Sequence, residues 1–318
     1  MKTRIFLLLL FLCVLPLYVI EAQQANKEII HNHLTAITKT DKFRNYKNIE
    51  TLNEIADYIH SVFSEYCDTV YFQEYLANGK TYKNVIGSIG VKNKERIIVG
   101  AHYDVYGDQE GADDNASGVV GLLELARLLE NHKTDYRIDF VAYSLEEPPF
   151  FRTQSMGSYV HAKSLNDANE VVKGMICLEM IGFFSEEPKS QTYPLPYKKI
   201  IYGNEADYIM IVQKMGNNSF SNQIKKLMKH AKLVDTKSIK APVSIPGIDF
   251  SDHLNYWAFG YDALMITNTS FYRNPNYHKP TDTMETLDLN KMAFVIDEMY
   301  YALSNFKKRK TDTKVVNK

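Results

Sequence analysis

The sequence predicts an α/β fold: a three-layer sandwich in which a mixed, mostly parallel sheet carries helices on both faces. From residue 96 onward, apolar runs of strand length alternate with helical patterns, as in βαβ units. Some of these runs are apolar almost throughout, as expected of strands that are buried on both faces. The chain of 318 residues is 45% hydrophobic and 24% charged, an ordinary globular composition with ample length for one large core.

The first third of the chain predicts helices, a hairpin and a buried strand. Apolar side chains recur at helical spacing between residues 48 and 66. The turn signal Asn78-Gly79 separates two β-rich runs, which favours a hairpin. In order, we expect a leading helix within 23–45, a helix at 48–66, hairpin strands at 69–76 and 82–89, and a strand at 96–102.

The rest of the chain alternates between the two patterns. Residues 117–130 are apolar on almost every side, which predicts a buried helix. The expected strands are 136–145, 172–181 and 261–267, and the other expected helices are 156–165, 206–232 (largely helical) and 289–306.

The N-terminus has the pattern of a secretory signal peptide. Lys2 and Arg4 precede an apolar run, residues 5–20, and Ala22 follows. The run is short for a membrane span, although a retained anchor is the alternative and Ile20 leaves the cleavage point open. We expect an exported protein, periplasmic or extracellular, with a signal peptide at 1–22, a single domain at 23–308 and a polar tail at 309–318.

Charge and cysteine content give weaker information. The formal net charge is -1 and the pI is about 6.8, so nothing in the overall charge indicates nucleic acid or an anionic membrane as partner. We expect no stable membrane partner once the signal peptide is removed. Export permits a disulfide between Cys67 and Cys177, but Cys177 lies in an apolar run and is expected to be a free, inert thiol.

Five short stretches together supply the ligands of a two-metal hydrolase site. They are His102-Tyr103-Asp104, Asp113-Asp114-Asn115-Ala116-Ser117-Gly118, Glu146-Glu147, Leu178-Glu179-Met180 and Tyr277-His278. Imidazoles and carboxylates in this ratio suit divalent zinc, with one carboxylate left over as a base. Three of the stretches follow predicted strands, where ligands bind in open α/β sheets.

Each stretch also has an ordinary structural explanation. The pair Asp113-Asp114 could cap the helix that follows, and a histidine at a strand end or in a loop is usually structural. Adjacent strand residues point to opposite faces, so one glutamate of Glu146-Glu147 could bind metal while the other moves a proton. Glu179 interrupts an apolar strand, and a buried carboxylate requires a metal or a basic partner.

The combined motifs resemble the M28 family of zinc peptidases, aminopeptidase-type exopeptidases with two co-catalytic zinc ions, over about residues 80 to 305. The resemblance implies the zinc-dependent exopeptidase fold and a cis peptide bond after Asp114. It implies metal ligation by His102, Asp114, Glu147, Glu179 and His278, with Asp114 bridging two Zn²⁺ ions. The pairing of His102 with Glu179 or with Glu147 stays open.

The same resemblance assigns the remaining roles. Glu146 becomes the general base, and Tyr277 donates to the oxyanion of the transition state. Around the ligands we expect supporting roles for Asp104, Asp113, Asp252 and His253. The implied substrate is a peptide with a free N-terminus.

Two features bear on the ligands and on the cleft. Glu179 departs from the family pattern, since many members have Asp there, so the position of that metal can differ. We expect Arg152, Tyr272 and Arg273 to line the cleft.

Two other functions compete with the hydrolase. A glutaminyl cyclase-like transferase would share the fold but use one zinc, and such enzymes often carry Trp where Tyr277 stands. A non-catalytic ectodomain of the same fold would be expected to lose ligands or base, and this chain keeps them all. Metal content separates the hydrolase from the cyclase.

Overall fold

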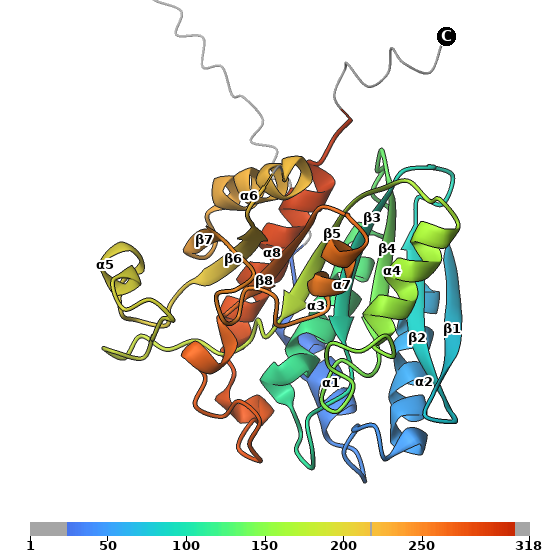
Figure 1. The fold of residues 1–318 in the computed structure, drawn as a ribbon, viewed down its shortest axis with the longest axis horizontal. Coiled ribbons are helices and arrows are strands. Elements are labelled where there is room, and N and C mark those ends of the chain that lie inside the picture. The colour runs from blue at the N-terminus through green and yellow to red at the C-terminus, as the bar shows by residue number, and fades with distance from the viewer. Residues whose placement is uncertain (1–23, 217, 309–318) are drawn as a thin grey trace, which may run out of the picture.

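The computed structural model describes residues 24–216 and 218–308, so the expected signal peptide and the polar tail lie outside the described residues. In this part of the chain, eight strands form one sheet in the order β1-β2-β4-β3-β5-β8-β6-β7 (Figure 1). The strands are β1 (Thr69–Ala77), β2 (Lys80–Ile89), β3 (Arg96–His102), β4 (Arg137–Tyr143), β5 (Val172–Glu179), β6 (Ile209–Lys214), β7 (Thr236–Ala241) and β8 (Ala263–Thr267).

The sheet is mixed, with a parallel centre. The pairs β4–β3, β3–β5, β5–β8 and β6–β7 are parallel, whereas β1–β2, β2–β4 and β8–β6 are antiparallel. The carboxyl ends of β3, β4, β5 and β8 therefore meet at one edge of the sheet. This arrangement confirms the predicted α/β sandwich and places the candidate ligands together.

Helices cover both faces of the sheet (Figure 1). One face carries α1 (Lys27–Thr38), α2 (Ile49–Tyr66), α3 (Gly118–Leu129), α6 (Ser219–Ala231) and α8 (Leu289–Ser304). The other carries α4 (Gly157–Asp167) and α7 (His253–Ala258). Successive side chains of β3 point to opposite faces of the sheet. Ile97 and Val99 pack with the first group of helices, and Ile98 packs with the second. The short elements are α5 (Lys198–Tyr202), η1 (Ala112–Ser117), η2 (Ser270–Tyr272) and η3 (Met284–Thr286).

One expected element was wrong in part, and the strand β7 and the short helices α5 and α7 were missed. Residues 206–232 were predicted to be largely helical, but β6 occupies the first part and α6 starts only at Ser219. The run Ile209–Lys214 is buried almost throughout, and a short apolar run does not distinguish a strand from a helix. Edge strand β7 is polar and α7 has only six residues, so neither gave a periodic signal.

Two further expectations concern the thiols and membrane spans. Cys67 and Cys177 are both free, and Cys177 is fully buried, as predicted for an inert core thiol. Burial raises the pKa of both thiols, which keeps them protonated. Among the described residues, the helices are too short or too polar to span a bilayer.

Candidate metal centre

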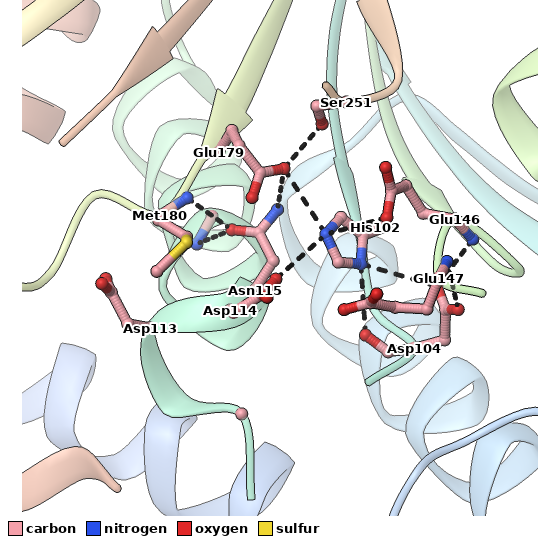
Figure 2. Close-up of polar contacts among 12 residues, drawn as sticks. His102, Asp104, Asp113, Asp114, Asn115, Glu146, Glu147, Glu179, Met180 and Ser251 are labelled. Carbon is pink, nitrogen blue, oxygen red and sulfur yellow. Dashed lines mark hydrogen bonds and ion pairs between the residues drawn. The ribbon is translucent and has the colours of Figure 1, made fainter. Parts of the chain in front are cut away.

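The candidate ligands converge at the carboxyl edge of the parallel strands, as the sequence predicted. His102 ends β3, Glu146 and Glu147 follow β4, and Glu179 ends β5. Asp114 reaches them from η1, which precedes α3. Figure 2 shows these side chains turned toward one another from separate elements. The peptide bond Asp114–Asn115 is cis, in agreement with the resemblance.

His102 lies between two carboxylates. Its Nε2 atom is 3.4 Å from Oδ1 of Asp114 and 3.4 Å from Oε2 of Glu179, and it lies 3.8 Å from Oε2 of Glu146 (Figure 2). Glu179 is held in this position by the hydroxyl of Ser251, which donates to Oε2 at 2.6 Å. The longer side chain of Glu179 therefore still brings its carboxylate to the histidine.

His278 forms a second trio with the other oxygen of the same aspartate. Its Nε2 atom is 3.2 Å from Oδ2 of Asp114 and 3.3 Å from Oε2 of Glu147. Asp114 thus presents one oxygen atom to each histidine. The ligand atoms of His102, Asp114 and Glu147 also lie within 4.8 Å of one another, so the two trios overlap. The shortest distances from a histidine nitrogen to a glutamate oxygen are those from His102 to Glu179, 3.4 Å, and from His278 to Glu147, 3.3 Å, so these residues form the pairs.

The site concentrates negative charge away from water. Burial raises the pKa of Glu147 to about 7, and burial also raises the pKa of Glu146 and of Glu179. Burial opposes charge on His102 as well, but the carboxylates of Glu146 and Glu179 raise its pKa well above the usual value. Several buried carboxylates around two imidazoles favour the binding of a compensating cation.

Asp114 is the exception to this trend. Burial opposes its ionisation, yet hydrogen bonds from His102 and His278 lower its pKa below the usual range. The carboxylate between the two histidines therefore stays ionised, as a bridging ligand must.

A further carboxylate, Asp104, holds the backbone of the glutamate pair. Its two oxygens accept from the backbone N–H groups of Glu146 at 3.0 Å and Glu147 at 3.1 Å. The Nδ1 atom of His102 lies 3.2 Å from the carbonyl oxygen of Asp104 and 3.5 Å from its Oδ1. The carbonyl is therefore the nearer partner of the imidazole, and the carboxylate mainly orients the two glutamates.

Asp113 and Asp282 hold the loops around Asp114. Oδ1 of Asp113 accepts from the N–H groups of Gly182 at 2.9 Å and Phe183 at 3.1 Å. Asp282 accepts from the N–H groups of Asp113 and Asp114, each at 3.0 Å. The sequence interpretation missed Asp282, although an acidic residue four positions after His278 in the same loop was a usable signal.

Two tyrosine rings pack against His278. The ring of Tyr277 is stacked on the imidazole at a centroid distance of 3.8 Å, and the ring of Tyr106 at 4.2 Å. Burial raises the pKa of Tyr277, so its hydroxyl remains a hydrogen-bond donor. Tyr106 was not predicted, because nothing in its local sequence connects it with residue 278.

Asp252 and His253 lie beside the centre, at the start of α7. Both are fully buried. Burial raises the pKa of Asp252 to about 7 and lowers that of His253 to about 4. The imidazole of His253 is 2.8 Å from the carbonyl oxygen of Ile248, which fixes the segment that leads to Ser251.

A cleft of about 210 Å³ opens onto the ligands. Asp114, Glu146, Glu147, Glu179 and His278 lie at one end. The remaining wall is largely apolar and includes Phe151, Phe250, Phe271, Met210, Val212 and Met265.

The structure separates the three residues that were expected at the cleft. Tyr272 lines it. Arg152 pairs with Asp249 at 2.8 Å and lies over the ring of Phe250, at the edge of the cleft wall. Arg273 is buried and donates to Gln191, so it supports the cleft wall from behind.

The comparisons with known proteins agree with this geometry. The family model described as peptidase family M28 matches residues 84–303, which is more than half of the chain. The chain belongs to peptidase family M28. This family membership supports a hydrolase that acts on peptides, and the candidate ligands support zinc.

Known proteins resemble the chain over nearly its whole length. The protein YfbL of Escherichia coli strain K12 is 40% identical, over 96% of this chain and all of that protein. The LapA aminopeptidase of Legionella pneumophila has a similar structure, with a TM-score of 0.70, 22% identity and coverage of 89% of this chain and 73% of that chain. A glutaminyl cyclase of Bacteroides thetaiotaomicron reaches a TM-score of 0.67 at 18% identity, with coverage of 89% and 99%. At these identities the two structures establish the fold, which aminopeptidases and glutaminyl cyclases share.

Proposed function

We propose that this M28 member is an aminopeptidase-type exopeptidase that uses two zinc ions. The observation that carries the proposal is the position of Asp114, whose two carboxylate oxygens lie 3.4 Å from His102 and 3.2 Å from His278. A carboxylate between two histidines, each with its own glutamate, is the donor set of a two-metal site with one bridging ligand.

The residues present fit such a pair of ions. All five donors are nitrogen or carboxylate oxygen, the ligand types that zinc takes. Oε1 of Glu147 is buried and has no hydrogen-bond partner among the described residues, which leaves it free for a metal. His102, Asp114 and Glu179 would hold one ion, and His278, Asp114 and Glu147 the other. The ions, when bound, would polarise the scissile carbonyl and make water acidic enough to react near neutral pH.

Glu146 is the proposed general base. It follows β4 beside both trios, its Oε2 atom is 3.8 Å from His102, and it makes no closer ion pair among the described residues. Its pKa is raised by burial, so it can accept a proton from water and return it to the leaving amine near neutral pH. Tyr277 is a donor at the wall of the cleft and would donate to the oxyanion.

The cleft supports a substrate with an apolar first residue. Its metal end is acidic and would bind a protonated or free α-amine, while the aromatic and aliphatic wall would take the adjoining side chain. Peptides with a free N-terminus should therefore be cleaved, and N-acetylated peptides of the same sequence should not. Equal cleavage of the two would contradict exopeptidase action.

The first prediction tests the base. Glu146→Gln keeps the size of the side chain but removes the proton acceptor, so kcat should fall about 10²- to 10⁴-fold while zinc content stays at two per chain. Metal analysis and turnover of amino-acid anilides measure both quantities. Glu74→Gln, an exposed change on β1, is the matched control and should leave both unchanged. Near-normal turnover by Glu146→Gln would show that another group is the base.

The same measurements separate the cyclase alternative. A glutaminyl cyclase-like transferase would hold one zinc per chain and cyclise peptides that begin with Gln. One zinc together with cyclisation would overturn the hydrolase proposal. Two zincs with release of the N-terminal residue would support it.

We also propose that the chain is exported and that residues 1–22 are removed. The basis is the pattern of Lys2, Arg4 and the apolar run at 5–20. N-terminal sequencing of the exported protein tests it, and a start at Met1 would show that the segment is retained.

A further inference from the structure

Large apolar side chains are exposed on α5. Tyr197, Ile200 and Ile201 expose 55%, 82% and 62% of their surface. Figure 1 shows α5 at the far left, standing away from the body of the molecule. Two adjacent isoleucines at such exposure cost hydration free energy unless something covers them.

The helix is fixed to edge strand β7 on its other side. The hydroxyl of Tyr202 donates to the carbonyl oxygen of Ser238 at 3.0 Å, and the amine of Lys237 donates to the carbonyl oxygen of Tyr202. Lys198 and Tyr202 also line the cleft. The helix is thus anchored by residues that face inward, while Ile200 and Ile201 are exposed and do not line the cleft.

More exposed apolar residues lie at the carboxyl end of β7. Met215 and Val243 expose 59% and 50% of their surface. The N–H group of Met215 donates to the carbonyl oxygen of Ala241, and the amine of Lys240 donates to that of Gly216, so these residues adjoin the same edge strand. We call α5, β7 and these neighbours the β7-edge surface.

This part of the chain is strongly basic. Residues 195–245 contain nine lysines against three acidic residues, Glu205, Asp207 and Asp235, although the whole chain has a net charge of only -1. On the β7-edge surface itself, Lys199 of α5 and Lys240 of β7 are exposed, and Lys198 and Lys237 of the same two elements are partly exposed. The low net charge of the whole chain therefore conceals a local excess: four lysines lie on α5 and β7, whereas the acidic residues beside these two elements are Glu205 and Asp235, and Asp235 pairs with Lys237 at 3.2 Å.

We propose that the β7-edge surface docks on an anionic lipid bilayer, with Ile200 and Ile201 in the boundary between headgroups and acyl chains. Aliphatic side chains with a neighbouring tyrosine and several lysines are the combination that binds such a boundary. Each exposed lysine would attract anionic headgroups, and its alkyl stem can lie along the apolar region.

Charge argues against a second copy of the chain as the occupant. A two-fold interface through this surface would bring two copies of the same lysine-rich surface face to face. A dimer of this kind would therefore oppose like charges, whereas an anionic bilayer neutralises them. The docking proposal is independent of the proposed reaction, because Ile200 and Ile201 lie outside the candidate metal centre and the cleft wall.

Vesicle binding tests the proposal. The purified protein should bind vesicles that contain phosphatidylglycerol, should bind pure phosphatidylcholine vesicles much more weakly, and should dissociate as salt is raised. The double variant Ile200→Asp/Ile201→Asp should lose about tenfold or more in affinity for the anionic vesicles. Lys199→Glu/Lys240→Glu should lose a similar factor on anionic vesicles only.

Leu76→Asp is the matched control, since Leu76 is 74% exposed on β1 at the opposite edge of the sheet and should be dispensable for binding. Hydrolysis of a small soluble peptide should be unchanged in every variant, so failure of docking and failure of the proposed reaction are distinguishable. Equal affinity of the double variant and the parent for anionic vesicles would overturn the proposal. So would a concentration-dependent dimer that the double variant abolishes, in the absence of vesicle binding.

Discussion

Asp282 is the residue on which the orientation of Asp114 depends most directly. Its two oxygens accept from consecutive N–H groups, those of Asp113 and Asp114, and so fix the backbone that carries the proposed bridging carboxylate. A shift of this backbone would change both halves of the centre at once, because the oxygens of Asp114 lie near both histidines.

Asp282→Asn should weaken zinc binding by about 10- to 100-fold, because the amide nitrogen would meet a backbone donor where an acceptor is needed. Competition with a chromogenic zinc chelator measures the affinity directly, without reference to activity. Asp288→Asn is the control: Asp288 also accepts from two backbone N–H groups, at the start of α8, but lies outside the centre. Parallel loss in both variants would indicate general destabilisation.

The ligand set was readable from residue types, whereas part of its support was not. His102, Glu146 and Glu179 lie at or just after the ends of apolar strands, and ligands bind at the carboxyl ends of strands in such sheets, so the sequence predicts that these residues lie together. The sequence left the partner of His102 open, and only the distances pair it with Glu179. Tyr106 could not be predicted as part of the centre, because its role rests on stacking against His278, a residue far away in the sequence.

Among the secondary-structure elements, β6 and α6 show the limit of local patterns. β6 is largely apolar and α6 is amphipathic, and only a few residues separate them, so the whole segment resembled one long helix. Tertiary contacts determine which part becomes a strand and which a helix. β6 pairs with β8 and β7, and the N-terminus of α6 is held by Asp262, the residue before β8. The central strands were predictable because burial on both faces gives them continuous apolar runs.

Asp262→Ala should lower the free energy of unfolding by about 1 kcal/mol, because α6 would lose its N-terminal cap. The carboxylate accepts from the N–H groups of Phe220 at 2.8 Å and Ser221 at 3.4 Å, and from the hydroxyl of Ser221. Urea denaturation measures the loss. Asp235→Ala removes an exposed carboxylate nearby and should change stability much less, so an equal loss in both variants would contradict the capping role.

Across the whole molecule, the candidate metal centre joins distant parts of the chain. Its ligands come from residues 102 to 278, from separate strand ends and loops around the carboxyl edge of one sheet. A metal that binds only the folded chain stabilises all of these elements together. The metal-free centre keeps several buried groups whose pKa values are displaced, so its stability must depend on pH.

Removal of zinc should lower the Tm, and the loss should be larger at about pH 8 than at about pH 6. Without metal, burial raises the pKa of Glu147 to about 7, and hydrogen bonds that His278 donates to Asp114 and Glu147 outweigh burial and raise the pKa of His278 to about 10. The folded state then holds protons that the unfolded state has released, so stability falls as pH rises through this range. Thermal unfolding with and without a chelator at both pH values is the measurement.

Asp114→Asn supplies the control for this experiment, since a variant without the proposed bridging carboxylate should respond little to the chelator. A chelator effect on the parent that shrinks from pH 6 to pH 8 would contradict the assigned direction.

Asp104, Asp113 and Asp282 also bear on how the reaction of such a protein can change over evolutionary time. These carboxylates position the backbone around the ligands through N–H groups, and every residue type except proline offers that group. The side chain at position 146 is therefore free to mutate without loss of the bond that holds its backbone. A lineage can exchange one chemistry for another by point substitution while its folding remains intact. If the residues that hold the backbone differ from those that carry the reaction, one fold can serve both aminopeptidases and glutaminyl cyclases.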